Sequence, residues 1–180
     1  MSRREEILAV AAGLFAEKGF HGVSVAELGA ACGFSGPALY RHFRSKDAIL
    51  AAMLVSISEE LLSVGQQRVA AAVDADEALR SLTEWHAEFA TGNKALIVVQ
   101  DRDWSSLPTE AREKVRTLQR KYVDLWARQL QALDGDLSLK EARARAHAAF
   151  GLINSTPHSG FLPREQMRDL LAEMAYKSLR

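Results

Sequence analysis

A short stretch of this sequence carries the side chains whose types and spacing could do chemistry: Tyr40, Arg41, His42 and Lys46. Phenol, guanidinium, imidazole and ammonium groups donate hydrogen bonds to anionic oxygens, and the charged groups do so strongly. Small residues occupy 35–38 just before them, which would let a backbone approach a large partner closely. The stretch therefore predicts a surface that contacts phosphates.

The rest of the sequence offers little for catalysis or metal binding. The single cysteine, Cys32, has no neighbouring base, and we find no metal-spaced His/Cys set, paired carboxylates or glycine-rich phosphate loop. On a predicted helix, His86 is two residues from Glu84 and two from Glu88, so it does not share a face with either. We expect neither an enzyme nor a bound metal or other cofactor.

Composition is that of a globular protein. Of 180 residues, 48% are apolar and 26% charged, and no run approaches the roughly 18 apolar residues that a membrane helix needs. We expect a cytoplasmic protein without membrane association. The formal net charge of zero disfavours a broad nucleic-acid surface, but Arg41, Arg44 and Lys46 concentrate positive charge locally.

Helical spacing of apolar residues dominates and period-two alternation is absent, so we expect an all-α fold. A first helix is predicted over 3–18, ended by Gly19. Ser24 and Glu27 have the spacing of a capping box at the start of a second helix. A short third helix starts at Ser35, and a fourth follows Ser45.

Later helices are predicted over 76–91, 94–106, 109–133, 138–156 and 164–179. We expect an N-terminal three-helix domain over 1–47 and a C-terminal helical domain over 48–180.

Helices two and three, joined at Gly33–Phe34, are typical of a helix-turn-helix, whose second helix enters the major groove of DNA by its N-terminal end. Leu39 and Phe43 would anchor that helix to the first two. Arg3 and Arg4 could reach a minor groove, although a solvated tail is the simpler interpretation.

The sequence here resembles the TetR family of bacterial regulators. The likeness rests on 15–19, 22–25, 30–33, Ser35 and above all the run 39–47, and it covers roughly residues 5–55.

The resemblance implies contacts to double-stranded DNA. Side chains expected at the sugar-phosphate backbone are Ser24, Ser35, Tyr40, His42 and Lys46, and residues expected near bases are Gly36, Pro37, Ala38 and Arg41. A phosphate role for Lys46 predicts that its removal lowers the salt slope of DNA binding by about one. Residues 36–38 lack long polar side chains, so apolar contacts to thymine methyls or readout of DNA shape would supply part of the specificity.

The resemblance also implies a homodimer that pairs through its last two helices and binds a pseudo-palindromic operator. Two stripes on these helices supply the candidate dimer contacts: Ala146, Phe150, Ile153, Leu170 and Met174. The alternative is that the stripes are intramolecular core.

A small-molecule effector would bind among the helices that follow residue 76. The candidate contacts are Trp85, Phe89, Arg102, Trp104, Tyr122, Trp126, His147 and Asn154. Aromatic residues at helical spacing are also typical of plain core, and His86 and His147 are more typical of core or surface than of ligand contacts.

The run 102–126 is similar to TetR-type regulators of fatty-acid and sterol breakdown, which sense acyl-CoA. Arginines that would then meet phosphates are Arg102, Arg112, Arg116 and Arg120. The last three could equally form the solvated face of a helix.

These patterns favour a repressor released from its operator by a small hydrophobic ligand, with acyl-CoA among the candidates. The alternative is a helical interaction module that does not bind DNA. The run 39–47 discriminates between them, because an interaction module has no reason to place Tyr40, His42 and Lys46 beside small residues at a helix start.

Overall fold

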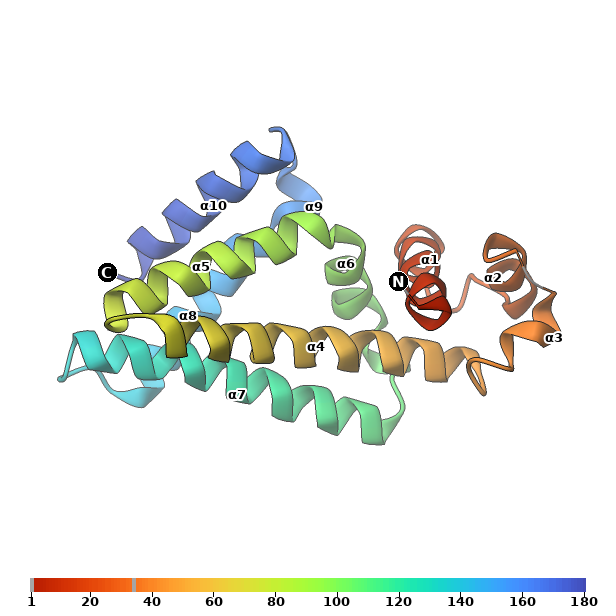
Figure 1. The fold of residues 1–180 in the computed structure, drawn as a ribbon, viewed down its shortest axis with the longest axis horizontal. Helices are drawn as coiled ribbons and strands as arrows, with labels where there is room; N and C mark the ends of the chain where they lie inside the picture. Colours follow the sequence, from red (N-terminus) through yellow and green to blue (C-terminus); the bar gives the residue numbers. More distant parts are fainter. Residues whose placement is uncertain (1, 34) are drawn as a thin grey trace. The chain divides into compact units, whose positions relative to one another are not determined.

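The computed structural model describes residues 2–33 and 35–180, and within these ranges the regular elements are all helical. The predicted all-α class is confirmed. In chain order (Figure 1) the elements are α1 Arg3–Lys18, α2 Val25–Ala31, α3 Gly36–Leu39, α4 Lys46–Ala71, α5 Ala75–Gly92, α6 Lys94–Asp103, the 3-10 helix η1 Trp104–Ser106, α7 Thr109–Leu133, α8 Leu139–Ile153, α9 Thr156–Ser159 and α10 Arg164–Ser178.

The chain forms two compact units, each made of two separate segments. The N-terminal unit contains 1–57 and 95–115, and the C-terminal unit contains 58–94 and 116–180. The long helices α4 and α7 each contribute to both units. The predicted division after residue 47 differs from this grouping, because α6, η1 and the first part of α7 pack with the N-terminal helices.

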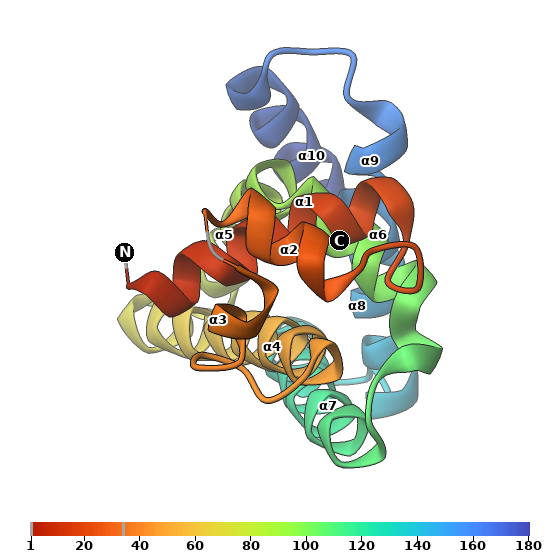
Figure 2. The ribbon, with the colours of Figure 1, turned by 90° about the vertical axis from the view of Figure 1, so that its right-hand side faces the viewer.

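The N-terminal unit is built on one hydrophobic core. Ile7 and Phe15 on α1, Leu28 on α2 and Leu54 on α4 are fully buried. Figure 2 shows α1, α2 and α3 together. The predicted anchors of α3 are confirmed, since Leu39 and Phe43 are both buried in this core. Later residues complete it: Val99, Leu107 and Val115.

Helix caps explain where α1 and α2 begin and end. The hydroxyl of Ser24 accepts the Glu27 amide at 3.1 Å, as predicted. The other half of the predicted capping box is wrong, because the Glu27 carboxylate accepts from the Lys18 ammonium at 2.5 Å. A charged donor at the end of α1 binds a carboxylate more strongly than a backbone amide does. Gly19 ends α1 with φ +81°, which favours glycine.

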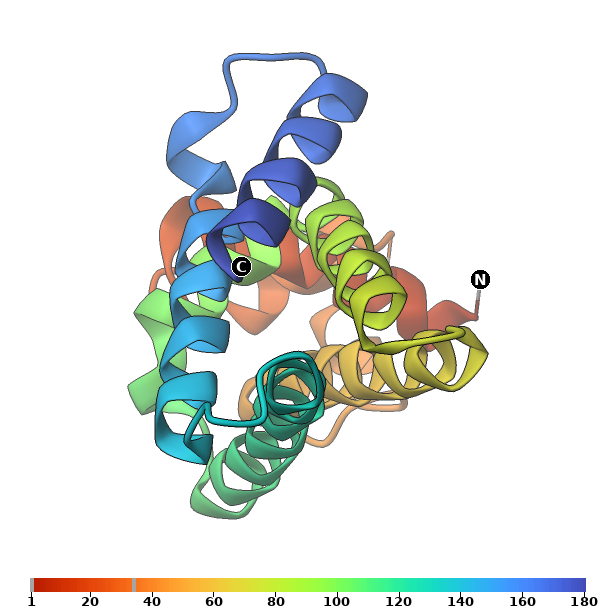
Figure 3. The ribbon, with the colours of Figure 1, turned by 90° about the vertical axis from the view of Figure 1, so that its left-hand side faces the viewer.

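The C-terminal unit is a set of packed helices in which α10 lies against both α5 and α8 (Figure 3). Its interior includes the fully buried side chains Leu79, Leu82, Trp126 and Ile153. Close packing leaves no room at Gly65 of α4, where a β-carbon would lie 2.8 Å from Cε2 of Tyr122.

One described helix, α4, is long and apolar enough to cross a membrane by length and composition. A core helix of a globular protein meets the same criterion. Ile49, Leu50 and Leu54 of α4 are fully buried in the core of the N-terminal unit.

Candidate DNA interface and candidate sensor core

Three of the predicted DNA-contacting residues lie on the turn that follows the very short α3. Tyr40, 54% exposed, and Arg41, also exposed, lie on the turn after this helix, whereas His42 there is half-buried. Ser35, just before α3, is exposed, and Ala38 is half-buried. The turn thus presents a phenol and a guanidinium to solvent.

The structure describes less about three of the residues named in the predictions. Phe34, in the predicted turn, lies outside the described residues. Gly36 and Pro37 have helical backbone in α3, and their predicted roles near bases stay predictions. Ser24 is exposed at the start of α2, where its hydroxyl already caps that helix.

The N-terminal arginines are not a solvated tail, so that interpretation was wrong. The Arg4 guanidinium donates to the His42 carbonyl at 2.7 Å and lies 3.9 Å from the centre of the Phe43 ring. The Arg3 guanidinium donates to the Cys32 carbonyl at 3.0 Å. Both side chains therefore tie the first turn of α1 to the segments that end α2 and α3.

Lys46 is also engaged inside the N-terminal unit. Its ammonium donates to the carbonyls of Phe20 and Val23 at 2.7 and 2.8 Å, and it lies 4.4 Å from the centre of the Phe20 ring. Two of its three N–H bonds therefore have acceptors in the α1–α2 loop, residues 19–24. This geometry leaves little donor capacity for the predicted phosphate contact.

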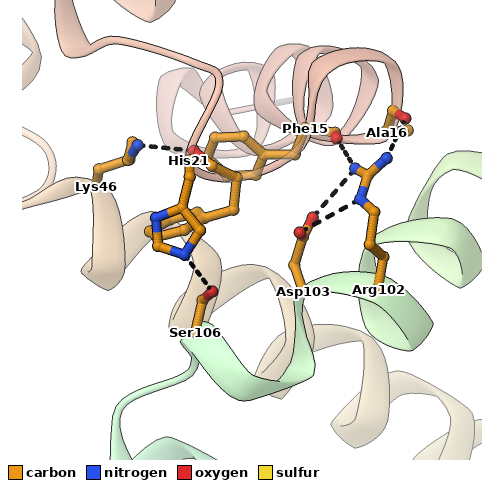
Figure 4. Close-up of polar contacts among 8 residues, drawn as sticks. Phe15, Ala16, His21, Lys46, Arg102, Asp103 and Ser106 are labelled. Carbon is orange, nitrogen blue, oxygen red and sulfur yellow. Dashed lines mark hydrogen bonds and ion pairs between the residues drawn. The ribbon is translucent and has the colours of Figure 1, made fainter.

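Arg102 holds the other end of the same loop (Figure 4). Its guanidinium donates to the carbonyls of Phe15 and Ala16 at the end of α1, and it pairs with the buried carboxylate of Asp103. The Arg102 guanidinium, which we predicted to contact a ligand, is therefore already bound by groups of the protein itself. The half-buried Trp104 packs on the core of the N-terminal unit.

An aromatic cluster with a buried polar centre forms inside the C-terminal unit. The His86 ring stacks on Phe150 at 4.8 Å and on Tyr122 at 5.7 Å between centroids, and Trp126 meets Phe150 edge-on at 4.9 Å. Five of the predicted effector contacts belong to this cluster. Trp85, Phe89, Tyr122 and Trp126 contact one another or His86 through their rings, and Asn154 contacts His86 by a hydrogen bond. We call it the sensor cluster.

Burial keeps His86 neutral, and its hydrogen bonds determine which ring nitrogen carries the proton. Burial lowers the pKa of its imidazole to about 4, so the ring is neutral at pH 7. Nε2 lies 3.1 Å from the amide oxygen of Asn154, which can only accept, so Nε2 carries the proton. Nδ1 then accepts from the Tyr122 hydroxyl at 3.3 Å.

Two buried indole donors of this cluster are not matched by acceptors in the described part of the chain. They are Nε1 of Trp85 and Nε1 of Trp126. The Trp126 nitrogen faces the Tyr122 hydroxyl but lies outside hydrogen-bonding geometry. Burial raises the pKa of Tyr122 well above its usual value, so the phenol stays protonated. Buried donors without acceptors are uncommon, and they are typical of sites that a ligand or water completes.

Comparison with known proteins identifies the family of this chain. The sequence profile of the bacterial regulatory proteins of the tetR family matches residues 7–53, and that of the tetracyclin-repressor-like C-terminal domain matches residues 72–179. The chain belongs to the TetR family. Its helix-turn-helix part and its helical C-terminal part correspond to the two parts of that family.

Individual TetR relatives are more distant. The chain is 28% identical over 131 residues to the transcriptional repressor KstR2 of Rhodococcus jostii strain RHA1, a match that covers 72% of this chain and 64% of KstR2. The match thus spans less than two thirds of that relative.

Solved TetR structures share the fold over almost the whole chain. PfmR from Thermus thermophilus is 27% identical, with a TM-score of 0.85 over 100% of this chain and 97% of PfmR. AibR, solved with isovaleryl coenzyme A and operator DNA, has a TM-score of 0.77 at 24% identity over 96% of this chain and 97% of AibR.

Two predicted dimer residues cannot contact a TetR partner subunit directly. Ala146 and Ile153 are fully buried within the single chain, so this part of the prediction was wrong and the intramolecular alternative holds for them. Leu170 and Met174, on α10, are 40% and 47% exposed and remain available. Phe150, half-buried, joins the sensor cluster.

Sequence reasoning missed the centre of the sensor cluster. His86 lies on α5 and Phe150 on α8, far apart in the sequence, and no local pattern pairs them. His147, which we predicted, is exposed and touches the cluster only edge-on, 6.1 Å from Phe150. The only local signal was the apolar face of α5, on which Leu82, His86 and Phe89 recur at helical spacing.

The four arginines that we predicted to meet phosphates have different surroundings in the structure. Arg102 and Arg112 donate to main-chain carbonyls, Arg112 to those of Ser105 and Leu107 at 2.9 Å each. Arg116 and Arg120 are exposed on α7. Arg102 and Arg112 are therefore engaged by main-chain carbonyls of the N-terminal unit.

Proposed function

We propose that this chain is a homodimeric one-component repressor that binds a pseudo-palindromic operator and releases it when a small hydrophobic effector enters the C-terminal unit. The observation that carries the proposal is that one TetR chain combines the exposed Tyr40 and Arg41 turn with a sensor cluster that holds unmatched buried donors.

The exposed turn supports DNA binding. Tyr40 and Arg41 follow the small residues of α3, and their side chains project from a unit held rigid by a single core. Two such turns in a two-fold dimer would meet successive major grooves about 34–36 Å apart.

The experiment that tests this is selection of random duplexes by the purified protein, followed by sequencing of the bound pool. Enrichment of a pseudo-palindrome supports a dimeric reader. An unenriched pool at low salt contradicts it and favours a helical interaction module that does not bind DNA.

The exposed apolar residues of α10 support a homodimer. We expect Met174→Glu to shift the protein from dimer to monomer in sedimentation velocity, because it places a charge within an apolar contact. Val73→Glu is the matched control, since Val73 is 87% exposed before α5 and carries no predicted contact. Equal behaviour of the two variants would contradict a dimer contact at Met174.

The sensor cluster supports an apolar effector that also accepts hydrogen bonds. Its rings are aromatic and its polar groups are neutral, a combination that suits small uncharged or amphipathic molecules once the rings separate. The similar fold of AibR was solved with isovaleryl coenzyme A, which makes acyl-CoA thioesters the first class to test. Exposed Arg116 and Arg120 are the arginines that could meet its phosphates.

Acyl-CoA thioesters of increasing chain length would be added to the complex of protein and selected duplex, with free coenzyme A as the control. Release by the thioesters alone supports an acyl-CoA effector. No change in DNA affinity at any chain length removes this class and leaves the repressor proposal to other apolar ligands.

A further inference from the structure

The α1–α2 loop, residues 19–24, and the end of α1 just before it are held by two cations that come from other parts of the chain (Figure 4). On one side, Lys46 at the start of α4 donates to the carbonyls of Phe20 and Val23. On the other, Arg102 near the end of α6 donates to the carbonyls of Phe15 and Ala16, just before the loop.

Each cation has a second partner that fixes its position. The Lys46 ammonium lies over the Phe20 ring, which attracts it through the ring quadrupole. The Arg102 guanidinium pairs with Asp103, whose side chain is 7% exposed. A third tie joins the Ser106 hydroxyl to Nε2 of His21 at 2.9 Å.

At the end of α1 the Phe15 carbonyl already accepts from the Gly19 amide at 2.8 Å. The last carbonyls of a helix can accept further donors, and a cation at that end also meets the negative end of the helix dipole. Arg102 supplies both at the end of α1. Moving Lys46 to a DNA phosphate would break two charge-assisted hydrogen bonds and leave the Phe20 and Val23 carbonyls without this donor.

We propose that Lys46 and Arg102 are positioning residues of the DNA reader: together they clamp the α1–α2 loop and so set where α2 begins, and neither of them contacts a phosphate. The clamp holds Ser24, which starts α2. The proposal rests on the proposed DNA binding for its functional consequence and on the contacts within the N-terminal unit for its structure.

The clamp makes α6 part of the reader. Residues 95–115 group with the N-terminal helices, and residue 94 is the last of its segment in the C-terminal unit. The polypeptide therefore passes from the sensor-containing unit into α6, and eight residues after Lys94 it reaches the guanidinium that holds α1.

The salt dependence of operator binding tests the proposal, because a lost phosphate contact and a lost positioning contact change it differently. Each phosphate contact contributes about one to the slope of log K against log salt concentration. We expect Lys46→Met and Arg102→Met to weaken binding at every salt concentration with an unchanged slope. Arg44→Met is the comparison variant, because Arg44 is an exposed residue of the same basic stretch with no expected base contact, and its slope should fall by about one.

A slope that falls by about one in Lys46→Met would show a phosphate contact and overturn the proposal for that residue. The same holds for Arg102→Met. Wild-type affinity in either variant would also overturn it. The double variant should lose less affinity than the sum of the two single losses, because both residues hold one loop.

Hydrogen exchange of the free protein tests the clamp without DNA. The amides of Gly19 and Gly22 donate to the carbonyls of Phe15 and Gly19, so they report opening of the loop. We expect both to exchange about tenfold faster in Lys46→Met and Arg102→Met, while amides of α8 are unchanged. Unchanged exchange at Gly19 and Gly22 would overturn the clamp.

The two measurements separate the two proposals. If the wild-type protein selects no duplex, the proposed function fails, and the clamp is still decided by the exchange of Gly19 and Gly22.

Discussion

The cations that join segments of the N-terminal unit and the buried polar groups of the sensor cluster have different kinds of hydrogen-bond partner. In the N-terminal unit, Arg4, Lys46 and Arg102 donate to main-chain carbonyls, which lie on a turn, in the α1–α2 loop and at the end of α1. In the C-terminal unit, His86 and Tyr122 bond to other side chains within a stack of rings. Carbonyl acceptors preserve one backbone geometry, whereas side-chain partners can be exchanged for a ligand.

The difference matches the tasks that we propose for the units. A DNA reader must hold its contacts in register, and ties to carbonyls do so without adding side-chain freedom. An effector site must open, and unmatched donors such as Nε1 of Trp126 make an incoming acceptor favourable.

The largest expected effect comes from removing the ring that fills the sensor cluster. Trp126 is fully buried, so Trp126→Ala should lower the free energy of unfolding by about 3–5 kcal/mol in urea denaturation. The near-ultraviolet circular dichroism of the stacked rings should weaken as well. A loss below about 1 kcal/mol would contradict the dense packing assigned to the cluster.

Acid should destabilise the C-terminal unit through His86. Its pKa is about 4 in the folded protein and about 6.5 in the unfolded chain. Below pH 6.5 the unfolded chain therefore binds a proton at this residue, while the folded protein stays unprotonated there until the pH approaches 4. The stability from this residue is complete above pH 6.5 and falls by roughly 3 kcal/mol as the pH drops to 4. Urea denaturation of His86→Phe across this range should show a smaller loss than the wild type, and parallel curves would contradict the assignment.

A smaller effect is expected at the ion pair of the N-terminal unit. Asp103→Asn removes the charge that faces Arg102, and because the arginine side chain is 42% exposed the cost should be about 1–2 kcal/mol of unfolding free energy. The half-buried Trp104 follows Asp103 directly, so a shift in its fluorescence should accompany the change. An unaltered melting temperature would mean that the clamp does not need its carboxylate.

The smallest effect is expected at the surface of α10. Lys177 pairs with Glu173 one helical turn away, and both side chains are well exposed to solvent, which screens the pair. Lys177→Met should leave the melting temperature unchanged within error. A clear decrease would mean that this face of α10 is covered in the assembled protein.

The helices were predictable from the sequence where local chemistry marks their ends. The bounds of α1 and α7 were predicted to the residue, since Gly19 and Pro108 interrupt the helical pattern there. The run 138–156 was predicted as one helix, but the structure has α8 followed by the separate short α9. The turn between them, near Asn154, has no clear signal in the local sequence.

The partners of charged side chains were not predictable in the same way. Lys46, Arg102 and Glu27 each have an obvious local role in the sequence, as phosphate contact, ligand contact and capping-box residue. Their partners in the structure come from other elements, 86 residues away for Arg102 and Ala16. Long side chains reach whichever acceptor the tertiary packing brings near, and local spacing does not encode that choice.

The divided make-up of the N-terminal unit has a consequence for how the protein is synthesised. Val99, Leu107 and Val115 belong to its core, yet they leave the ribosome after the whole segment 58–94 of the other unit. The apolar surface of the first helices therefore stays partly uncovered until that segment and the residues after it have been translated. A chimaera that exchanges only residues 1–47 would pack that apolar surface against residues of another protein, and the end of its α1 would depend on an arginine of that protein.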